Sequence, residues 1–113
     1  MAILERRLDG DFYEILKRIE KGILEGSISA TLEHSSDFYG VRTRCSVRVF
    51  ERYSWIGRNR VSLSITLFQD ERGDIYLSAI TSGGSTACFF KINTVGEEAL
   101  LDKLQELVPN NKE

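Results

Sequence analysis

The chain contains 113 residues, carries a formal net charge of -2, and has 28% charged side chains. A chain of this length fits one domain with a single core, because about two thirds of its unfolded surface can be buried on folding. The near-neutral balance excludes a global bias toward nucleic acid or anionic membranes. We therefore expect residues 1–113 to form one soluble domain.

The N-terminus and the cysteine content indicate a cytoplasmic protein. Acidic and basic residues occur within the first eleven positions, where no apolar run is long enough for a signal peptide or a membrane span. The two cysteines, Cys45 and Cys88, are too few for a disulfide scaffold and lack the close spacing of a redox or zinc motif. We expect no membrane partner, no metal and no cofactor.

The N-terminal segment predicts a strand over Ala2–Leu8 and then a helix over residues 11–25. Asp9, Gly10 and Asp11 interrupt the strand and supply possible N-cap oxygens. Apolar residues then recur at the spacing of one helical stripe: Phe12, Ile15, Leu16, Ile19 and Ile23. Gly26 is typical of the residue that ends a helix.

Four later stretches alternate apolar and polar residues, which predicts strands that bury one face. Their apolar members are Ile28, Ala30 and Leu32; Val41, Thr43, Cys45, Val47 and Val49; Val61, Leu63, Ile65 and Leu67; and Ile75, Leu77 and Ala79. We expect the odd-numbered residues of 41–49 and of 61–67 to point into the core, with their even-numbered neighbours facing solvent. This phase places Cys45 in the core.

Short polar connections between these stretches favour antiparallel neighbours. The first connection is predicted to contain Ser35, Ser36, Asp37 and Gly40, the second residues 55–59, and the third residues 70–74 with Gly73 at a tight turn. After a glycine-rich interruption, residues 86–93 form either a fifth strand of this series or an irregular crossing.

The C-terminal segment predicts a second helix. Thr94 and Glu97 have the spacing of a capping box, and Pro109 marks the end of the helix. The buried stripe is Leu100, Leu101, Leu104, Leu107 and Val108. Residues 110–113 are expected to be a frayed polar tail.

These elements together predict a two-layer α+β sandwich, in which an antiparallel sheet of four to six strands carries two helices on one face. The predicted order is β-α-β-β-β-β-(β)-α. This order resembles the helix-grip fold in topology, although topology alone does not carry function.

Arginines concentrate in residues 40–60, which hold six arginines and one acid, a local charge of +5. Because they share one strand parity, Arg42, Arg44, Arg48 and Arg52 are predicted to form a row on the solvent face. The candidate binding surface combines this row with Ser62, Ser64, Tyr76 and Ser78. Such a row could bind phosphate or other anions, or it could be a solvated sheet face.

Two further features have competing interpretations. Aromatic residues predicted on the same face, namely Phe50, Phe68 and Tyr76, could stack nucleic acid bases. A face that carries Phe50, Phe68 and Ile80 could instead form the patch of a homodimer, which is the preferred interpretation. The loop Ser82, Gly83, Gly84 and Ser85 could hold an anion, but it lacks a phosphate-loop signature, so a simple turn is the preferred interpretation. No catalytic constellation surrounds the single histidine, His34.

Several unbroken strings carry a resemblance to a known family: residues 51–55 (ERYSW), 59–63 (NRVSL), 78–85 (SAITSGGS), 89–94 (FFKINT) and 96–98 (GEE). Together they make the chain similar to a family of small uncharacterised bacterial proteins, found mostly in Gram-positive bacteria. The resemblance covers nearly the whole chain and implies a stand-alone cytoplasmic protein. It implies no activity, cofactor or catalytic residue.

Three functional hypotheses remain open. The leading one is a non-enzymatic binding or self-associating module that forms a homodimer through the polar sheet face. The second is a small-ligand carrier with a pocket between the C-terminal helix and the sheet, lined by Val47, Leu63, Leu77 and Leu104. The third is an anion or nucleic-acid binder that uses the arginine row.

Overall fold

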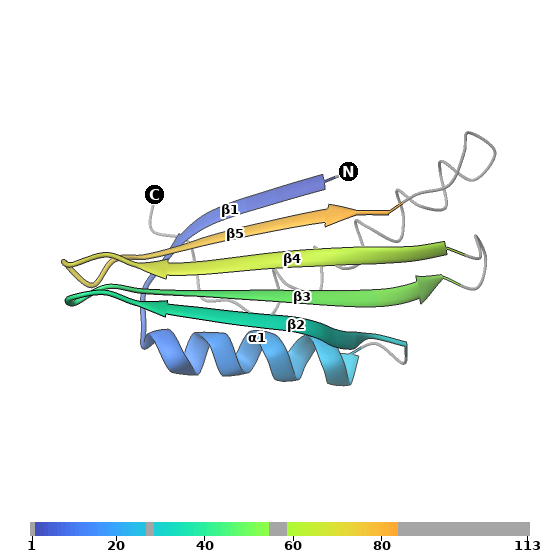
Figure 1. The fold of residues 1–113 in the computed structure, drawn as a ribbon, viewed down its shortest axis with the longest axis horizontal. Helices are drawn as coiled ribbons and strands as arrows, with labels where there is room; N and C mark the ends of the chain where they lie inside the picture. Colours follow the sequence, from blue (N-terminus) through green and yellow to red (C-terminus); the bar gives the residue numbers. More distant parts are fainter. Residues whose placement is uncertain (1, 27–28, 55–58, 84–113) are drawn as a thin grey trace.

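A computed structural model describes residues 2–26, 29–54 and 59–83. In chain order its elements are β1 (Ala2–Leu8), α1 (Phe12–Gly26), β2 (Thr31–Tyr39), β3 (Arg44–Ser54), β4 (Asn59–Gln69) and β5 (Ile75–Ser82). The five strands form one antiparallel sheet in the order β1-β5-β4-β3-β2 (Figure 1). The predicted α+β class with an antiparallel sheet is therefore confirmed.

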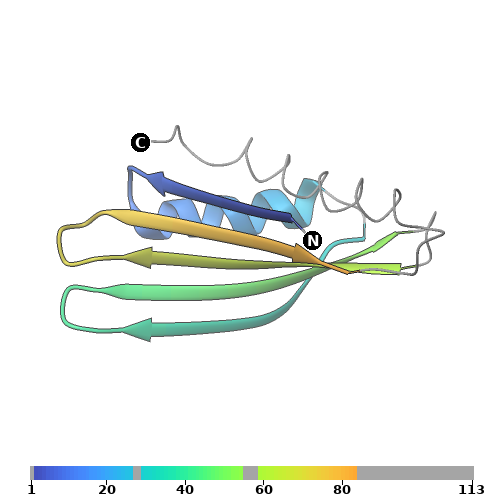
Figure 2. The same ribbon diagram turned by 90° about the horizontal axis from the view of Figure 1, so that it is seen from above.

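The helix connects the two edges of the sheet. β2 to β5 follow one another as neighbours, while β1 pairs with β5 at the far edge. Because every neighbouring pair is antiparallel, β1 and β2 run in the same direction, and α1 carries the chain from one edge to the other. Figure 2 shows that α1 lies on one side of the sheet. That side is called the helix side below, and the opposite one the open face.

α1 forms where the sequence pattern predicted it, displaced by one residue at each end. The Asp11 carboxylate accepts a hydrogen bond from the Glu14 amide at 3.0 Å, which is an N-cap. All five residues of the predicted stripe are buried: Phe12, Ile15, Leu16, Ile19 and Ile23. They pack with the inward residues of four strands, Leu4, Leu8, Phe50, Val61, Leu63, Ile65, Leu67, Ile75, Leu77 and Ala79.

The predicted phase of β4 is confirmed, whereas that of β3 is wrong. Ser54 pairs with Asn59, so the connection contains an even number of residues, and odd positions of β4 lie opposite even positions of β3. Arg48 therefore pairs with Ile65, and Phe50 with Leu63, on the helix side. Cross-strand partners share a face. The odd-numbered residues from Cys45 to Val49 consequently face the open side.

This register buries the guanidinium of Arg48 against α1 and β2. Arg48 is 8% exposed, and its Nε donates to Glu20 Oε2 of α1 at 2.5 Å. Its Nη1 donates to Asp37 Oδ1 of β2 at 3.0 Å, and the Ser46 hydroxyl donates to the same oxygen at 2.6 Å. Although burial alone lowers the Arg48 pKa, the hydrogen bonds that Arg48 donates to the two carboxylates raise it overall. The network ties α1, β2 and β3 together.

β2 departs most from its prediction. It covers Thr31–Tyr39, so the residues assigned to a connection, Ser35, Ser36 and Asp37, are strand, and the actual turn lies at 40–43. All nine strand residues are exposed, and the register shifts between Leu32 and His34. β2 is an edge strand and has a neighbouring strand on one side only. All nine of its residues can therefore be exposed, and its sequence need not alternate apolar and polar residues. The bulge interrupts the edge that another strand could join.

The β4–β5 hairpin confirms the third predicted connection. The Gly73 amide donates to the Asp70 carbonyl at 3.0 Å, and Gly73 has a φ of 93°, a left-handed conformation that favours glycine. The Asp70 carboxylate accepts hydrogen bonds from the backbone amides of Arg72 and Asp74. Asp70 therefore organises this turn through its own carboxylate.

Several predictions lie outside the described residues. These are the second helix after Thr94, the strand or crossing over residues 86–93, the polar tail over residues 110–113, and the connection over residues 55–58.

Replacing Arg48 by alanine tests the network. The Arg48→Ala variant leaves Glu20 and Asp37 without their cation, and we expect it to lower the free energy of unfolding by about 2 kcal/mol. This is less than for a fully buried pair, because both carboxylates are partly exposed. Arg52→Ala is the control on the same side of the same strand, with an expected change within about 0.5 kcal/mol. Equal losses in urea denaturation would contradict the assignment.

The network also predicts a dependence of stability on pH. Hydrogen bonding from Ser46, and then from Arg48, holds the Asp37 pKa below its ordinary value despite partial burial. The folded state therefore binds fewer protons than the unfolded state, so this stabilisation is present above about pH 4 and is lost as the pH falls through the folded pKa. We expect the stability difference between wild type and Asp37→Asn to shrink at acidic pH. A difference that is constant in urea denaturation from neutral to acidic pH would exclude this role.

Candidate functional site

The open face consists of rows that run across the strands, because cross-strand partners lie side by side. The aromatic row contains Arg7, Tyr76, Phe68, Cys45 and Phe38. The hydroxyl row contains Glu5, Ser78, Thr66, Val47 and Ser36. The aliphatic row contains Ile3, Ile80, Ser64, Val49 and His34.

Large apolar side chains of the two outer rows are exposed to solvent. Phe38 is 65% exposed and Ile3 59%, while Phe68, Tyr76 and Ile80 each have 38–40% of their surface exposed. The Phe68 and Tyr76 rings stack with centroids 6.4 Å apart and an interplanar angle of 26°. Several apolar side chains in one continuous area are typical of an interaction surface, unlike single scattered ones.

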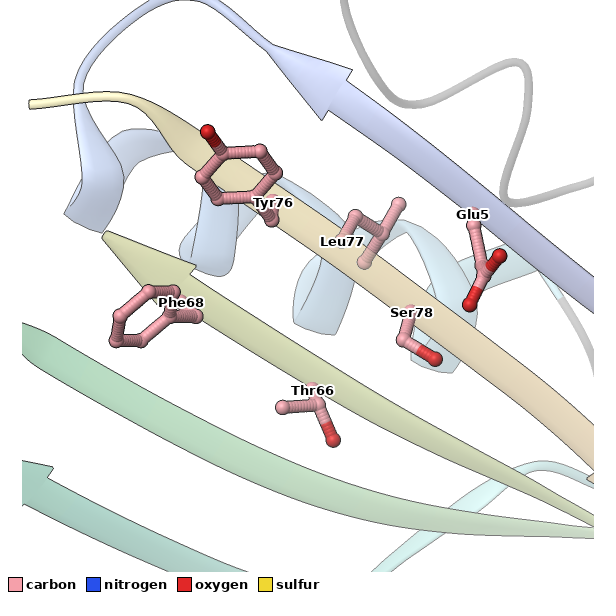
Figure 3. A pocket seen from close by; sticks show the side chains of 6 residues that line it. All are labelled: Glu5, Thr66, Phe68, Tyr76, Leu77 and Ser78. Atoms are coloured by element: carbon pink, nitrogen blue, oxygen red, sulfur yellow. The ribbon is translucent and has the colours of Figure 1, made fainter. Parts of the chain in front are cut away.

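A shallow hollow lies beside the stacked rings (Figure 3). Its volume is about 330 Å³, and its lining residues are Glu5, Thr66, Phe68, Tyr76, Leu77 and Ser78. The short side chains of Thr66 and Ser78 form its floor next to the taller rings, and the Glu5 carboxylate points toward Ser78 from β1. At Thr66 and Ser78 the hydroxyl row is therefore a trough beside the aromatic row.

Charged residues lie at the margins of this face. Arg7 donates to Asp74 Oδ1 at 2.9 Å, and this hydrogen bond and the Asp74 charge raise the Arg7 pKa. At the other end, Arg60 pairs with Glu51 at 3.0 Å. Both pairs are solvent-exposed, so their contribution to stability is small. The centre is left to hydroxyl and apolar groups.

The structure separates the residues that the sequence grouped into one binding surface. Ser62, Ser64, Tyr76 and Ser78 lie on the open face, as predicted. Arg44, Arg48 and Arg52 lie on the helix side, because β3 has the opposite phase. Arg42 lies in the turn before β3, with a φ of 64°. The arginine row on the open face does not exist.

The apolar residues predicted beside that row are also divided. Phe50 is 1% exposed and belongs to the core, so its assignment to the solvent face was wrong. Phe68 and Ile80 do lie on the open face. Cys45, predicted to be buried, is half-buried on the open face because it pairs with Phe68.

The described half of the glycine-rich loop has a structural explanation. The Ser82 and Ser62 hydroxyls are 2.7 Å apart and hydrogen bond to one another. Gly83 has a φ of 141°, and a Cβ atom there would lie 2.4 Å from the Arg60 carbonyl oxygen. Glycine is thus required by close backbone contact. Gly84 and Ser85 lie outside the described residues.

The pocket proposed for a ligand carrier cannot have its predicted lining. Leu63 and Leu77 are buried on the helix side, whereas Val47 lies on the open face opposite Thr66. The side chain of Val47 therefore points away from those of the two leucines. Leu104 is outside the described residues.

Metal-binding groups do not gather within the described ranges. No group of three or more His, Cys, Asp or Glu side chains there could hold a metal ion. His34 is exposed on the edge strand, in the aliphatic row. The open face as described can therefore bind by shape and by hydroxyl and apolar contacts.

Sequence reasoning missed Ile3, Val47 and Val49 as members of the open face. For Ile3 a signal existed: Ile3 and Leu4 are adjacent, so a strand must place one of them on each face. For Val47 and Val49 no local signal existed, because valines at alternating positions of a strand indicate its buried face. Only pairing with β4 reverses that interpretation.

Comparisons with known proteins place the chain in a family without assigning an activity. No curated protein and no solved structure matches the chain. Within residues 2–26, 29–54 and 59–83, no helix has the length and apolar character needed to cross a membrane. Residues 1–112 match the family described as "Family of unknown function (DUF6054)", and the chain belongs to that family.

Proposed function

We propose that this protein is a non-enzymatic binding module that self-associates through the open face and forms a homodimer. The observation that carries the proposal is the pair of exposed apolar rows on either side of the hydroxyl trough. Aromatic residues are enriched at protein interfaces, where hydroxyl groups satisfy hydrogen bonds without the desolvation cost of full charges. The charged pairs lie at the margins, as in an interface rim.

The size of the face suits a second copy of the chain. Five strands spaced about 4.8 Å apart and seven residues long, at about 3.3 Å per residue, give roughly 600 Å² per copy. Two copies would bury about 1,200 Å², which is the lower end of the range for specific complexes. A reversible dimer is therefore the expected state.

Charge and shape favour one arrangement of the two copies. A two-fold axis that runs across the strands, between the aromatic and hydroxyl rows, superposes each row on the other row of the partner. The Tyr76 ring then lies over the partner's Ser78, and Arg7 lies over the partner's Glu5. Large side chains enter the trough of the facing copy, and two opposite-charge pairs form at the rim. An axis centred on the hydroxyl row would instead bring two Glu5 carboxylates together.

Three further features belong to this proposal. We propose a cytoplasmic location in bacteria, supported by the free thiol of Cys45 on a partly exposed face.

The β-α-β-β-β-β order of the described elements is compatible with a helix-grip arrangement once a second helix follows. Such a helix on the helix side leaves the open face available for the partner.

Sedimentation velocity over a dilution series tests the dimer. We expect the wild-type sedimentation coefficient to rise from low to high micromolar concentration. Ser78→Arg places a long charged side chain in the trough and is expected to keep the protein monomeric throughout. Val41→Arg, which adds the same charge at an exposed turn residue away from both faces, is expected to behave as wild type. A wild-type chain that stays monomeric at high micromolar concentration would exclude self-association.

A charge reversal tests the proposed orientation. Glu5→Lys would face Arg7 of the partner copy, and we expect the dimer dissociation constant to rise about tenfold, which corresponds to 1.4 kcal/mol. Glu25→Lys makes the same charge change at the exposed end of α1 and should leave dimerisation unchanged. If both variants dimerise as tightly as wild type, the orientation is wrong, although the dimer itself would stand.

A further inference from the structure

Three aromatic residues surround an arginine at one end of the helix side. Arg44 opens β3, and Tyr39, its cross-strand partner, closes β2. The Arg44 Cζ atom lies 4.9 Å from the ring centroid of Tyr13 and 5.8 Å from that of Phe12, both at the start of α1. The Phe12 and Tyr13 rings meet edge to face, with centroids 5.4 Å apart. The guanidinium is therefore held by aromatic contacts from the helix.

Arg44 forms no ion pair with a carboxylate of the described chain, in contrast to three other arginines. Arg7, Arg48 and Arg60 each form an ion pair with an aspartate or a glutamate. Asp37, the nearest acid on the same face of β2, is already engaged by Arg48 and Ser46. The charge of Arg44 is thus not neutralised by a described carboxylate.

Two tyrosines, Tyr13 and Tyr39, are neighbours of this cation. A guanidinium packed against aromatic rings keeps its N–H edge free to donate two parallel hydrogen bonds to an oxyanion. Tyr13 and Tyr39 remain about half or more exposed. The charge of Tyr13, then burial and a hydrogen bond with Tyr13, raise the Tyr39 pKa, and Arg44 only partly opposes this. Phenols are protonated at neutral pH, so the Tyr39 hydroxyl can donate a hydrogen bond.

We propose that Arg44, together with the hydroxyls of Tyr13 and Tyr39, binds a phosphate group. A phosphate offers three or more acceptor oxygens. Two parallel N–H groups of Arg44 can donate to two of these oxygens, and a tyrosine hydroxyl can donate to a third. The two oxygens of a carboxylate lie in one plane, whereas those of a phosphate are arranged tetrahedrally, so the arginine and a phenol outside its plane can each contact a different phosphate oxygen. The site is on the helix side and does not depend on the dimer proposed for the open face.

Titration of the full chain with inorganic phosphate at constant ionic strength tests the site. Side-chain NMR signals of the arginine Nε–H groups report on each guanidinium. We expect a saturable shift of the Arg44 signal, with a dissociation constant of about 1 mM or tighter. Arg44→Gln should abolish saturable binding, and Arg44→Lys should weaken it at least fivefold because the fork is lost.

Matched variants separate the site from general charge effects. Arg52→Gln removes the same charge from the same side of β3, away from the tyrosines, and should bind phosphate as wild type does. Tyr39→Phe removes only an exposed hydroxyl, so it tests the site even where Arg44→Gln destabilises the fold; we expect it to weaken binding severalfold. A linear, non-saturating response, or equal losses in Arg44→Gln and Arg52→Gln, would overturn the proposal. Acetate binding as tight as phosphate would overturn the selectivity for phosphate.

Discussion

The register between β3 and β4 is the constraint on which the rest of this structure depends. Once Ser54 pairs with Asn59, each even-numbered residue of β3 is directed to the helix side. A shift by one residue would exchange the two faces of the strand completely. It would place Val47 and Val49 under α1 and release Arg48 to solvent. The core contacts of β4, which are unambiguous in the sequence, therefore determine what β3 buries.

On the helix side the register buries the charged side chain of Arg48, and two ion pairs offset the cost of removing this charge from water. A buried guanidinium is unfavourable unless its charge and hydrogen bonds are satisfied. Arg48 is satisfied by Glu20 from the helix and by Asp37 from the edge strand. The second contact comes from an element that the core hardly reaches, since β2 is exposed along its whole length. The same ion pairs that make Arg48 tolerable also attach β2 and orient α1.

On the open face the register exposes apolar side chains of β3 instead of burying them. Valines and a cysteine from β3 join Phe68, Tyr76 and Ile80, so a face expected to be cationic is instead apolar with hydroxyl groups. The positive segment 40–60 does not create one positive surface. Three of its arginines have different surroundings: Arg48 lies in a buried network, Arg44 in an aromatic cluster and Arg60 in an exposed pair. For this reason we propose a protein partner for the open face and a phosphate at Arg44.

The amino-acid pattern correctly predicted the strand β1, the helix α1 with its buried stripe, the phase of β4 and β5, and the Asp70 hairpin. For α1, β4, β5 and the hairpin, the local periodicity or turn chemistry has one solution. It did not determine β3, because that strand is amphipathic in both phases: Val47 and Val49 alternate with Ser46, Arg48 and Phe50. Nor did it predict β2 over Ser35 to Asp37, because an edge strand needs no apolar alternation. Only tertiary pairing decided these elements, since the choice rests on ion pairs and cross-strand partners that are distant in the chain.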